Sequence, residues 1–362
     1  MKLRSVVILF LTAFNLLNAQ NVRTKNIIIL IGDGMGINYV GASLLQDPNS
    51  PFKEFKSIGL SITCSADKLI TDSAAGATAI ATGYLTKNKY VGVDSSGNSL
   101  YTIFEHAEKL GLSTGIVVTS TVSHATPGAF FAHTNNRNDQ LLIASQLVDK
   151  DVDVVIGGGL KYFLPKNLSG EREDNRNLLD ILKTKKYNIP QNYLELSTLP
   201  ESNTKLCALF EMDALPQSSN RDYSLGDLTK KALSHLKNDS DGFVIMIEGS
   251  QIDWAGHDHK SKELLEEMKD FSSAVSEALL FAKADSNTLV LITSDHETGG
   301  MSISKGNRDA SNLELSYSTE SHTPSPVGIF AFGPGEELFK GIMNINSIGQ
   351  NLFHLLDSAY KF

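Results

Sequence analysis

Cysteine is scarce in this sequence, with two residues, Cys64 and Cys207, among 362. Exported domains that depend on disulfides carry many more cysteines for their length, so the composition excludes a disulfide scaffold. The two thiols could pair in an oxidising compartment, or each could be buried on its own. Both alternatives stay open from the sequence alone.

Positive charge is also low, because 32 basic residues face 41 acidic ones and the net charge is −9. Removing residues 1–19 takes away Lys2 and Arg4 and no acid, which leaves 30 basic against 41 acidic residues, or −11. Nucleic-acid binding depends on neutralising phosphates with Lys and Arg, so this balance excludes a general nucleic-acid binder. Any anion must be bound by local charge, such as metal ions or a single arginine.

Long apolar runs are missing after the N-terminus, and none there is long enough to span a bilayer. Residues 1–19 have the pattern of an export signal, with a positive start, an apolar run at 6–11 and a small-residue cleavage site at 17–19. A membrane anchor is the alternative, but the apolar run is short for one. Gln20 stands where a lipid-anchored protein needs cysteine. We therefore expect an exported protein, periplasmic or secreted, without a membrane anchor.

The remaining chain alternates apolar, strand-like runs with helix-like segments. This alternation is typical of a three-layer α/β/α sandwich around a mostly parallel sheet, and we expect one such domain over 20–362. The polar segment 165–220 carries four prolines and no clear period, which favours a peripheral insertion. The expected strands are 26–31, 113–119, 152–156, 243–247 and 288–293, and the expected helices are 100–110, 139–149, 225–237 and 261–284.

Candidate functional residues follow several of these strands at once. Asp33, Glu248 and the pair Asp295-His296 come directly after apolar runs, where ligands collect at the carboxyl ends of parallel strands. Asp253 and His257 are four residues apart, so one helical turn would put both on one face, as a Zn²⁺ site needs. The alternative for each is ordinary: a helix cap at Asp33, surface acids in a strand-to-helix loop, or a chance Asp-His pair.

A second set of candidates could handle an anion. Ser73 begins the small-residue segment 71–79, and a helix N-terminus offers free N–H groups and partial positive charge. Arg137 has the fork that best matches phosphate oxygens. The alternatives are a plain helix cap at Asp72 or Ser73 and a solvated charge at Arg137. His322 is a lone loop histidine, which is usually solvated.

The combination of motifs resembles the alkaline phosphatase family over nearly the whole chain after residue 26. The matching segments are IGDGMG (31–36), TDSAAGATA (71–79), HATPGAFFAH (124–133) with Arg137, GGGLKYF (157–163), EGSQIDWAGH (248–257), TSDHETGG (293–300) and SHT (321–323).

The resemblance implies metal-dependent hydrolysis of phosphate monoesters through a phosphoserine, with the following roles. Ser73 would be the nucleophile, and Arg137, oriented by Asp72, would hold the phosphate. The ion ligands would be Asp253, His257 and His322 for one Zn²⁺, Asp33, Asp295 and His296 for a second, and Asp33, Thr126 and Glu248 for Mg²⁺.

Two positions depart from the pattern of many relatives. Trp254 stands where others carry Lys or His, so it would line the substrate side without adding charge, or simply pack. His124 stands beside the expected Mg²⁺ ligands where some relatives carry Asp, which makes the third ion the one most open to change. The resemblance is compatible with a homodimer, although surface segments that build dimer contacts in larger relatives are expected to be trimmed.

Two other functions compete with this interpretation. One is a phosphodiesterase or sulfatase of the same superfamily, although Ser73-Ala74-Ala75-Gly76 lacks the C/S-x-P-x-R context of sulfatases. The other is a non-catalytic exported protein that binds metal or phosphate. Such a protein would be expected to lose the nucleophile or some ligands, and here Ser73 and every ligand position are filled.

Overall fold

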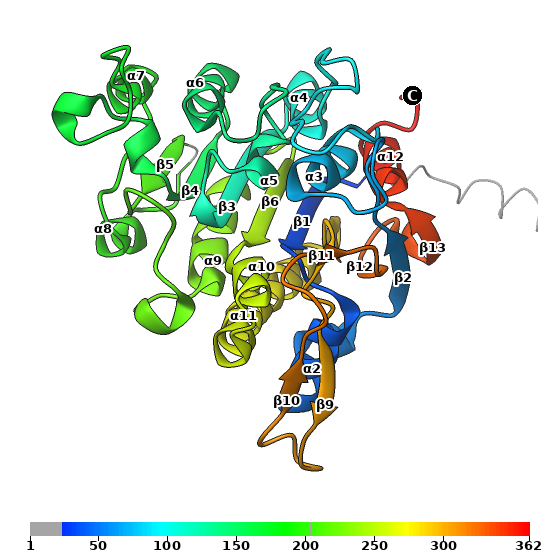
Figure 1. Ribbon diagram of the computed structural model, residues 1–362. Coiled ribbons are helices and arrows are strands. Elements are labelled where there is room, and N and C mark those ends of the chain that lie inside the picture. The colour runs from blue at the N-terminus through cyan, green and yellow to red at the C-terminus, as the bar shows by residue number, and fades with distance from the viewer. Residues whose placement is uncertain (1–23, 203) are drawn as a thin grey trace, which may run out of the picture.

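The computed structural model describes residues 24–202 and 204–362, so the expected export signal at 1–19 lies outside the described residues. Within the described ranges, nine strands form one central sheet (Figure 1). In chain order they are β1 (Asn26–Gly32), β2 (Ser57–Ile62), β3 (Ser113–Thr121), β4 (Val154–Gly158), β5 (Leu206–Leu209), β6 (Phe243–Gly249), β7 (Thr288–Thr293), β12 (Val327–Phe332) and β13 (Gly341–Asn344).

The sheet has the order β13-β2-β12-β7-β1-β6-β3-β4-β5. Neighbouring strands run parallel except at β12, which is antiparallel to both β7 and β2. Parallel strands are buried on both faces, which explains why β1 is a continuous apolar run with every residue buried. The mostly parallel sheet of the expected α/β fold is confirmed.

Helices cover both faces of the sheet and make the three layers (Figure 1). Alternate residues of β1 point to opposite faces: Ile27, Ile29 and Ile31 pack with one helix layer, and Ile28 and Leu30 with the other. The first layer contains α3 (Ser73–Thr82), α4 (Ile103–Lys109), α6 (Gln140–Lys150) and α12 (Ile345–Leu356), and the second contains α2 (Ile37–Gln46), α9 (Leu225–Leu236) and α11 (Ser261–Asp285). None of the helices in the described ranges is long and apolar enough to cross a membrane.

The register of the three central strands aligns their carboxyl ends. Ile31 of β1 pairs with Glu248 of β6 on one side and with Thr293 of β7 on the other. The residues that follow, including Asp33 and Asp295, therefore leave the sheet at one place. This shared edge is where the polar side chains described below converge.

The segment 165–220 takes part in the main sheet. It contains α7 (Leu178–Thr184) and α8 (Tyr193–Thr198), and β5 within it is the edge strand beside β4, with all four of its residues buried. Cys207 lies on β5, whereas Cys64 follows β2 near the opposite end of the sheet. That separation is far beyond the span of a disulfide, and in the described chain both residues are free thiols.

Close packing of α12 against α3 fixes the helix that begins at Ser73. All residues of α3 are buried, and a Cβ added at Gly349 of α12 would lie 2.6 Å from the carbonyl oxygen of Ile80 and 2.7 Å from that of Ala79. Backbone atoms cannot move aside as a flexible side chain can, so this contact requires glycine. By contrast, Gly41 of α2 has no neighbour nearer than 4.0 Å to an added Cβ.

We expect Gly349→Ala to lower the free energy of unfolding by about 1–3 kcal/mol, because the extra methyl overpacks the contact between α12 and α3. Gly41→Ala is the matched control, and it should raise the free energy of unfolding by about 0.5–1 kcal/mol, since alanine has the better helix propensity and has room there. Urea denaturation of both variants measures the difference. Equal stabilisation by the two substitutions would contradict the packing described.

Candidate active site

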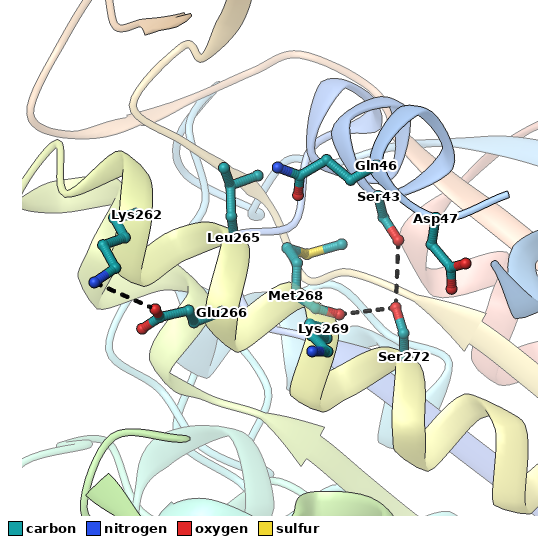
Figure 2. Close-up of a pocket in the computed structure, with 9 residues that line it drawn as sticks. All are labelled: Ser43, Gln46, Asp47, Lys262, Leu265, Glu266, Met268, Lys269 and Ser272. Atoms are coloured by element: carbon teal, nitrogen blue, oxygen red, sulfur yellow. Dashed lines mark hydrogen bonds and ion pairs between the residues drawn. The ribbon is translucent and has the colours of Figure 1, made fainter. Parts of the chain in front are cut away.

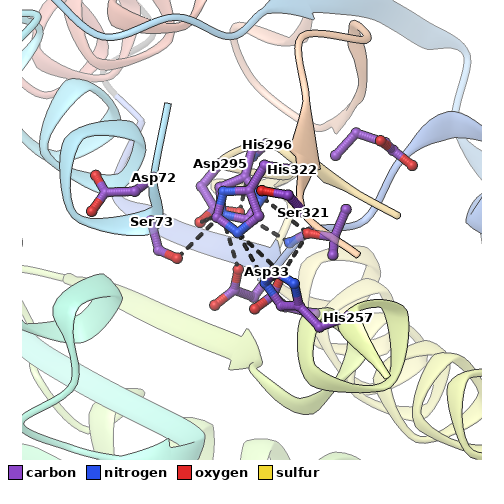
Figure 3. Close-up of polar contacts among 12 residues, drawn as sticks. Asp33, Asp72, Ser73, His257, Asp295, His296, Ser321 and His322 are labelled. Atoms are coloured by element: carbon purple, nitrogen blue, oxygen red, sulfur yellow. Dashed lines mark hydrogen bonds and ion pairs between the residues drawn. The ribbon is translucent and has the colours of Figure 1, made fainter. Parts of the chain in front are cut away.

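Four carboxylates and several imidazoles meet where β6, β1 and β7 end. Figure 3 shows Asp33, Asp295 and three of the imidazoles, His257, His296 and His322, close together. Asp33 follows β1, Glu248 lies at the end of β6, and Asp295 follows β7. Asp253 comes from α10 (Gln251–His257), the helix that leaves β6. All four carboxylates are buried, so they are far from the water that would stabilise their charge.

Asp253, His257 and His322 form the first group of potential metal ligands. The Nε2 atoms of the two imidazoles are 3.1 Å apart, and Oδ1 of Asp253 is 3.4 Å from His257 Nε2 and 3.7 Å from His322 Nε2. Each imidazole has its other nitrogen on a backbone carbonyl: His257 Nδ1 is 2.6 Å from Glu320 O, and His322 Nδ1 is 3.0 Å from Thr71 O.

Those carbonyl contacts determine the tautomer of both rings. A carbonyl can only accept a hydrogen bond, so each Nδ1 carries a proton and donates it. Both Nε2 atoms then face the same small space beside Asp253 Oδ1. The hydrogen bond to Asp253 raises the pKa of His257 to about 9, so this space favours positive charge, which a proton or a metal ion can supply. Donation of the second nitrogen to a carbonyl is the usual support of a metal-binding histidine.

His296 is the centre of a second group, with Asp33 and Asp253 (Figure 3). Its Nε2 is 3.6 Å from Asp33 Oδ1, 3.2 Å from Asp295 Oδ2 and 3.2 Å from the hydroxyl of Ser73. Asp253 therefore lies within reach of both the first and the second group, whereas the resemblance assigned it to the first group only. The Ser73 hydroxyl points at the donor atoms and away from solvent.

A third group consists of Asp33, Glu248 and His124. The resemblance placed His124 beside the ligands, but here its ring has a nitrogen within 4.8 Å of the carboxylate oxygens of the other two. Burial lowers the pKa of His124 to about 4, so the ring is neutral and has a free lone pair. The Thr126 hydroxyl, on the short helix α5 (Ala125–Gly128), is buried and has no hydrogen-bond partner among the described residues.

Several oxygens of these carboxylates have no hydrogen-bond donor in the described part of the chain. Among the described residues, both oxygens of Asp33, Oε1 of Glu248 and Oδ2 of Asp295 are buried with no hydrogen-bond donor. Burial, with the neighbouring Asp295, raises the pKa of Asp33 well above its usual range, and burial raises the pKa of Glu248 to about 7. Protons or cations must supply the missing positive charge. Oxygen and imidazole donors in this arrangement fit divalent metal ions.

Asp72, Ser73 and Arg137 lie together at the start of α3. Asp72 caps the helix by accepting from Ala75 N at 3.0 Å, and its other oxygen accepts from Arg137 Nη1 at 3.0 Å. Lys89 N also donates to that second oxygen, at 3.0 Å, so the carboxylate is fixed from three sides. The arrangement leaves the rest of the Arg137 guanidinium free to meet an anion at the helix N-terminus.

Trp254 lies on α10 next to Asp253 and packs against His124, with ring centroids 6.3 Å apart and planes at 81°. It therefore touches the third group of ligands as well as forming part of the half-buried surface around the site. The contact gives Trp254 a packing role. Its contact with substrate stays a prediction.

The sequence did not identify the groups that hold the ligands in place. These are the carbonyls of Thr71 and Glu320 and the hydroxyl of Thr298, which contacts Asp253 and lies 3.3 Å from His296 Nδ1. The carbonyls have no sequence signal, since any residue supplies one. Thr298 had a weak signal, as it is the second residue after His296 in the segment TSDHETGG.

A surface pocket of about 560 Å³ lies elsewhere, between α2 and α11 (Figure 2). Its lining includes Ser43, Asp47, Leu265, Lys269 and Ser272, and it contains no histidine. The pocket shares no residue with the three ligand groups.

Known proteins of one family are similar to this chain over most of its length. The family described as alkaline phosphatase matches residues 24–316. Alkaline phosphatase 3 of Bacillus subtilis is 38% identical over 297 residues, which cover 77% of this chain and 62% of that protein. The chain thus spans less than two thirds of the length of this relative. The human tissue-nonspecific alkaline phosphatase is 30% identical over 377 residues, covering 88% of this chain and 72% of that protein.

Solved structures show the same fold. Alkaline phosphatase from the Antarctic bacterium TAB5 is 36% identical and superposes with a TM-score of 0.84, covering 92% of this chain and 98% of that one. A variant of the TAB5 enzyme, with one histidine replaced by aspartate, has been solved with Mg bound in its M3 site. This chain belongs to the alkaline phosphatase family.

Proposed function

We propose that this chain hydrolyses phosphate monoesters to an alcohol and inorganic phosphate, with Ser73 as the nucleophile. One observation carries the proposal: the Ser73 hydroxyl begins a buried helix and lies 3.2 Å from a histidine nitrogen among buried metal-ligand atoms. A hydroxyl becomes a nucleophile only when something lowers its pKa, and adjacent metal coordination does so.

The proposed ligands keep the assignment made from the resemblance. Asp253, His257 and His322 would hold one Zn²⁺, and Asp33, Asp295 and His296 a second. Asp33, Thr126 and Glu248 would hold Mg²⁺ through oxygen atoms, with His124 beside them. The relative solved with Mg in its M3 site is a variant in which aspartate replaces a histidine, and it supports Mg²⁺ as the ion of this third site. When bound, these ions would lower the pKa of a hydroxyl or water and neutralise charge on the phosphate and on the leaving oxygen.

The residues of the chain then divide the reaction. Ser73 loses its proton to solvent and attacks phosphorus as the bond to the alcohol oxygen breaks, and the departing alkoxide takes up a proton to leave as the alcohol. Water then loses a proton and attacks the same phosphorus, the bond to Ser73 Oγ breaks, Ser73 regains a proton, and inorganic phosphate leaves. Arg137, held by Asp72, would donate two hydrogen bonds to phosphoryl oxygens in both steps, and the N–H groups of the first turn of α3 would add to this.

Ser73→Ala should reduce turnover of a chromogenic phosphomonoester by about 10³-fold or more, because the covalent step is lost. Bound zinc, measured by elemental analysis, should stay at the wild-type level, since Ser73 is not needed as a ligand. Ser43→Ala, a buried serine of α2 remote from the site, is the control and should keep wild-type turnover. Near-normal turnover of Ser73→Ala would refute the nucleophile assignment.

Arg137→Ala should cost more with a monoester than with a diester, because the diester offers one charged oxygen fewer to the guanidinium. Loss of a charged hydrogen-bond pair corresponds to about 10–100-fold in kcat/KM for the monoester. Arg137→Lys keeps the charge and loses the fork, so it should recover only part of the monoester activity. Equal losses on both substrates would count against the phosphate clamp.

The mature protein is proposed to begin at Gln20 after export and to form a homodimer. The export pattern of residues 1–19 supports the first point. An apolar face at the edge of the sheet supports the second: Ile58 and Ile62 of β2 and Ile342 of β13 are 51%, 43% and 72% exposed. Intact-mass analysis of the exported protein should give a chain starting at Gln20, and a longer chain would contradict the cleavage site.

Light scattering on the same protein should give twice the chain mass, and a monomer would contradict the homodimer.

A further inference from the structure

The hydroxyl of Thr298 connects the first two ligand groups. Thr298 lies on β8 (Glu297–Thr298), directly after Asp295 and His296, and it is fully buried. Its Oγ1 makes a short hydrogen bond to Oδ1 of Asp253 and lies 3.3 Å from Nδ1 of His296. Asp253 belongs to the group with His257 and His322, and His296 to the group beside Ser73. One hydroxyl therefore touches a ligand from each group.

The directions of these two hydrogen bonds follow from the single proton of the hydroxyl. The Asp253 carboxylate can only accept, so Thr298 donates to it. The hydroxyl can then only accept from His296, which places a proton on Nδ1 and leaves Nε2 with its lone pair. That Nε2 atom is the one that faces Asp33, Asp295 and Ser73.

The backbone of Thr298 makes hydrogen bonds beyond those of the two-residue strand β8. Its N–H donates to Gly34 O at 3.1 Å, and its carbonyl accepts from the hydroxyl of buried Tyr39. In the antiparallel pairing of β8 with β11 (His322–Thr323), Thr298 is the direct partner of His322. The position of the hydroxyl is thus set by segments that also carry the ligands.

Two glycines leave room for this arrangement. A Cβ at Gly34, which has a φ of +67°, would lie 2.5 Å from Thr298 Oγ1 and 2.8 Å from Asp253 Oδ1. A Cβ at Gly256 would lie 2.6 Å from the Tyr39 hydroxyl and 3.2 Å from Thr298 Cγ2. The backbone therefore approaches Thr298 from both sides more closely than a residue with a side chain would allow.

We infer that Thr298 is a positioning residue that couples the two zinc groups, and that its hydroxyl raises the affinity for both ions. The inference rests on the proposed function in that it takes the two groups to be zinc sites. Thr298 contacts neither substrate nor metal in this role. It acts by fixing the ring of His296 and the carboxylate of Asp253, and outer contacts of this kind are worth about 10–100-fold in metal affinity.

Zinc titration tests this directly. Metal-free protein is titrated with Zn²⁺ in competition with a chromogenic chelator, for wild type, Thr298→Val and Thr298→Ser. Valine keeps the shape and loses the hydroxyl, so both zinc equivalents should bind about 10–100-fold more weakly, whereas serine keeps the hydroxyl and should stay within about three-fold of wild type. Thr114→Val is the matched control and should bind Zn²⁺ with wild-type affinity. Thr114 is a buried threonine at the beginning of β3, and its hydroxyl has no partner among the described residues.

Several results would overturn the inference. Wild-type zinc affinity in Thr298→Val would remove the role altogether, and weakening of only one zinc equivalent would remove the coupling. If Thr298→Val does not fold, as judged by circular dichroism, the comparison of Thr298→Ala with Thr298→Ser isolates the same hydroxyl. The titration does not depend on turnover, so a zinc-loaded wild type that fails to hydrolyse a phosphomonoester would refute the proposed function separately.

Discussion

Repulsion among four buried carboxylates is the constraint on which the rest of this structure depends. Asp33, Glu248, Asp253 and Asp295 lie together where water cannot screen them, and removing an ion from water costs several kcal/mol unless positive charge replaces the lost hydration. Burial and the neighbouring carboxylates raise the pKa of Asp33 more than Arg137 lowers it, and Arg137 is itself paired with Asp72. The folded chain therefore brings together negative charge that divalent cations would neutralise, and imidazole nitrogens lie among the same carboxylates as potential ligands.

The fold supports this concentration of charge through close backbone packing. Parallel strands β6, β1 and β7 end at one edge, which brings acids that are over 200 residues apart into contact. Small residues close the space around them: a Cβ at Gly76 of α3 would lie 2.8 Å from the carbonyl oxygen of Asp295. The helix that begins with Ser73 can thus lie directly against the strand ends, and Gly349 allows α12 to pack against the backbone near its other end.

The sequence predicted the central strands well because buried parallel strands are unbroken apolar runs, as in β1 and β6. It gave no clear signal for β2, where Ser57 and Ser61 are buried while Ile58 and Ile62 are exposed, the reverse of the usual pattern. Asp33, Glu248 and the pair Asp295-His296 could be identified because they follow strands directly, whereas His322 was assigned only from the family resemblance. The partners of their outer nitrogens could not, since His322 meets the carbonyl of Thr71, 251 residues away, through tertiary packing alone.

The central claim is that these acids and imidazoles surround divalent cations next to the Ser73 hydroxyl. Anomalous diffraction from crystals of the zinc-loaded protein, recorded on both sides of the zinc absorption edge, tests it most directly. The account predicts one zinc peak between Asp253, His257 and His322 and a second beside His296 and Ser73. Peaks confined to the protein surface, or an empty cluster at saturating zinc, would contradict it.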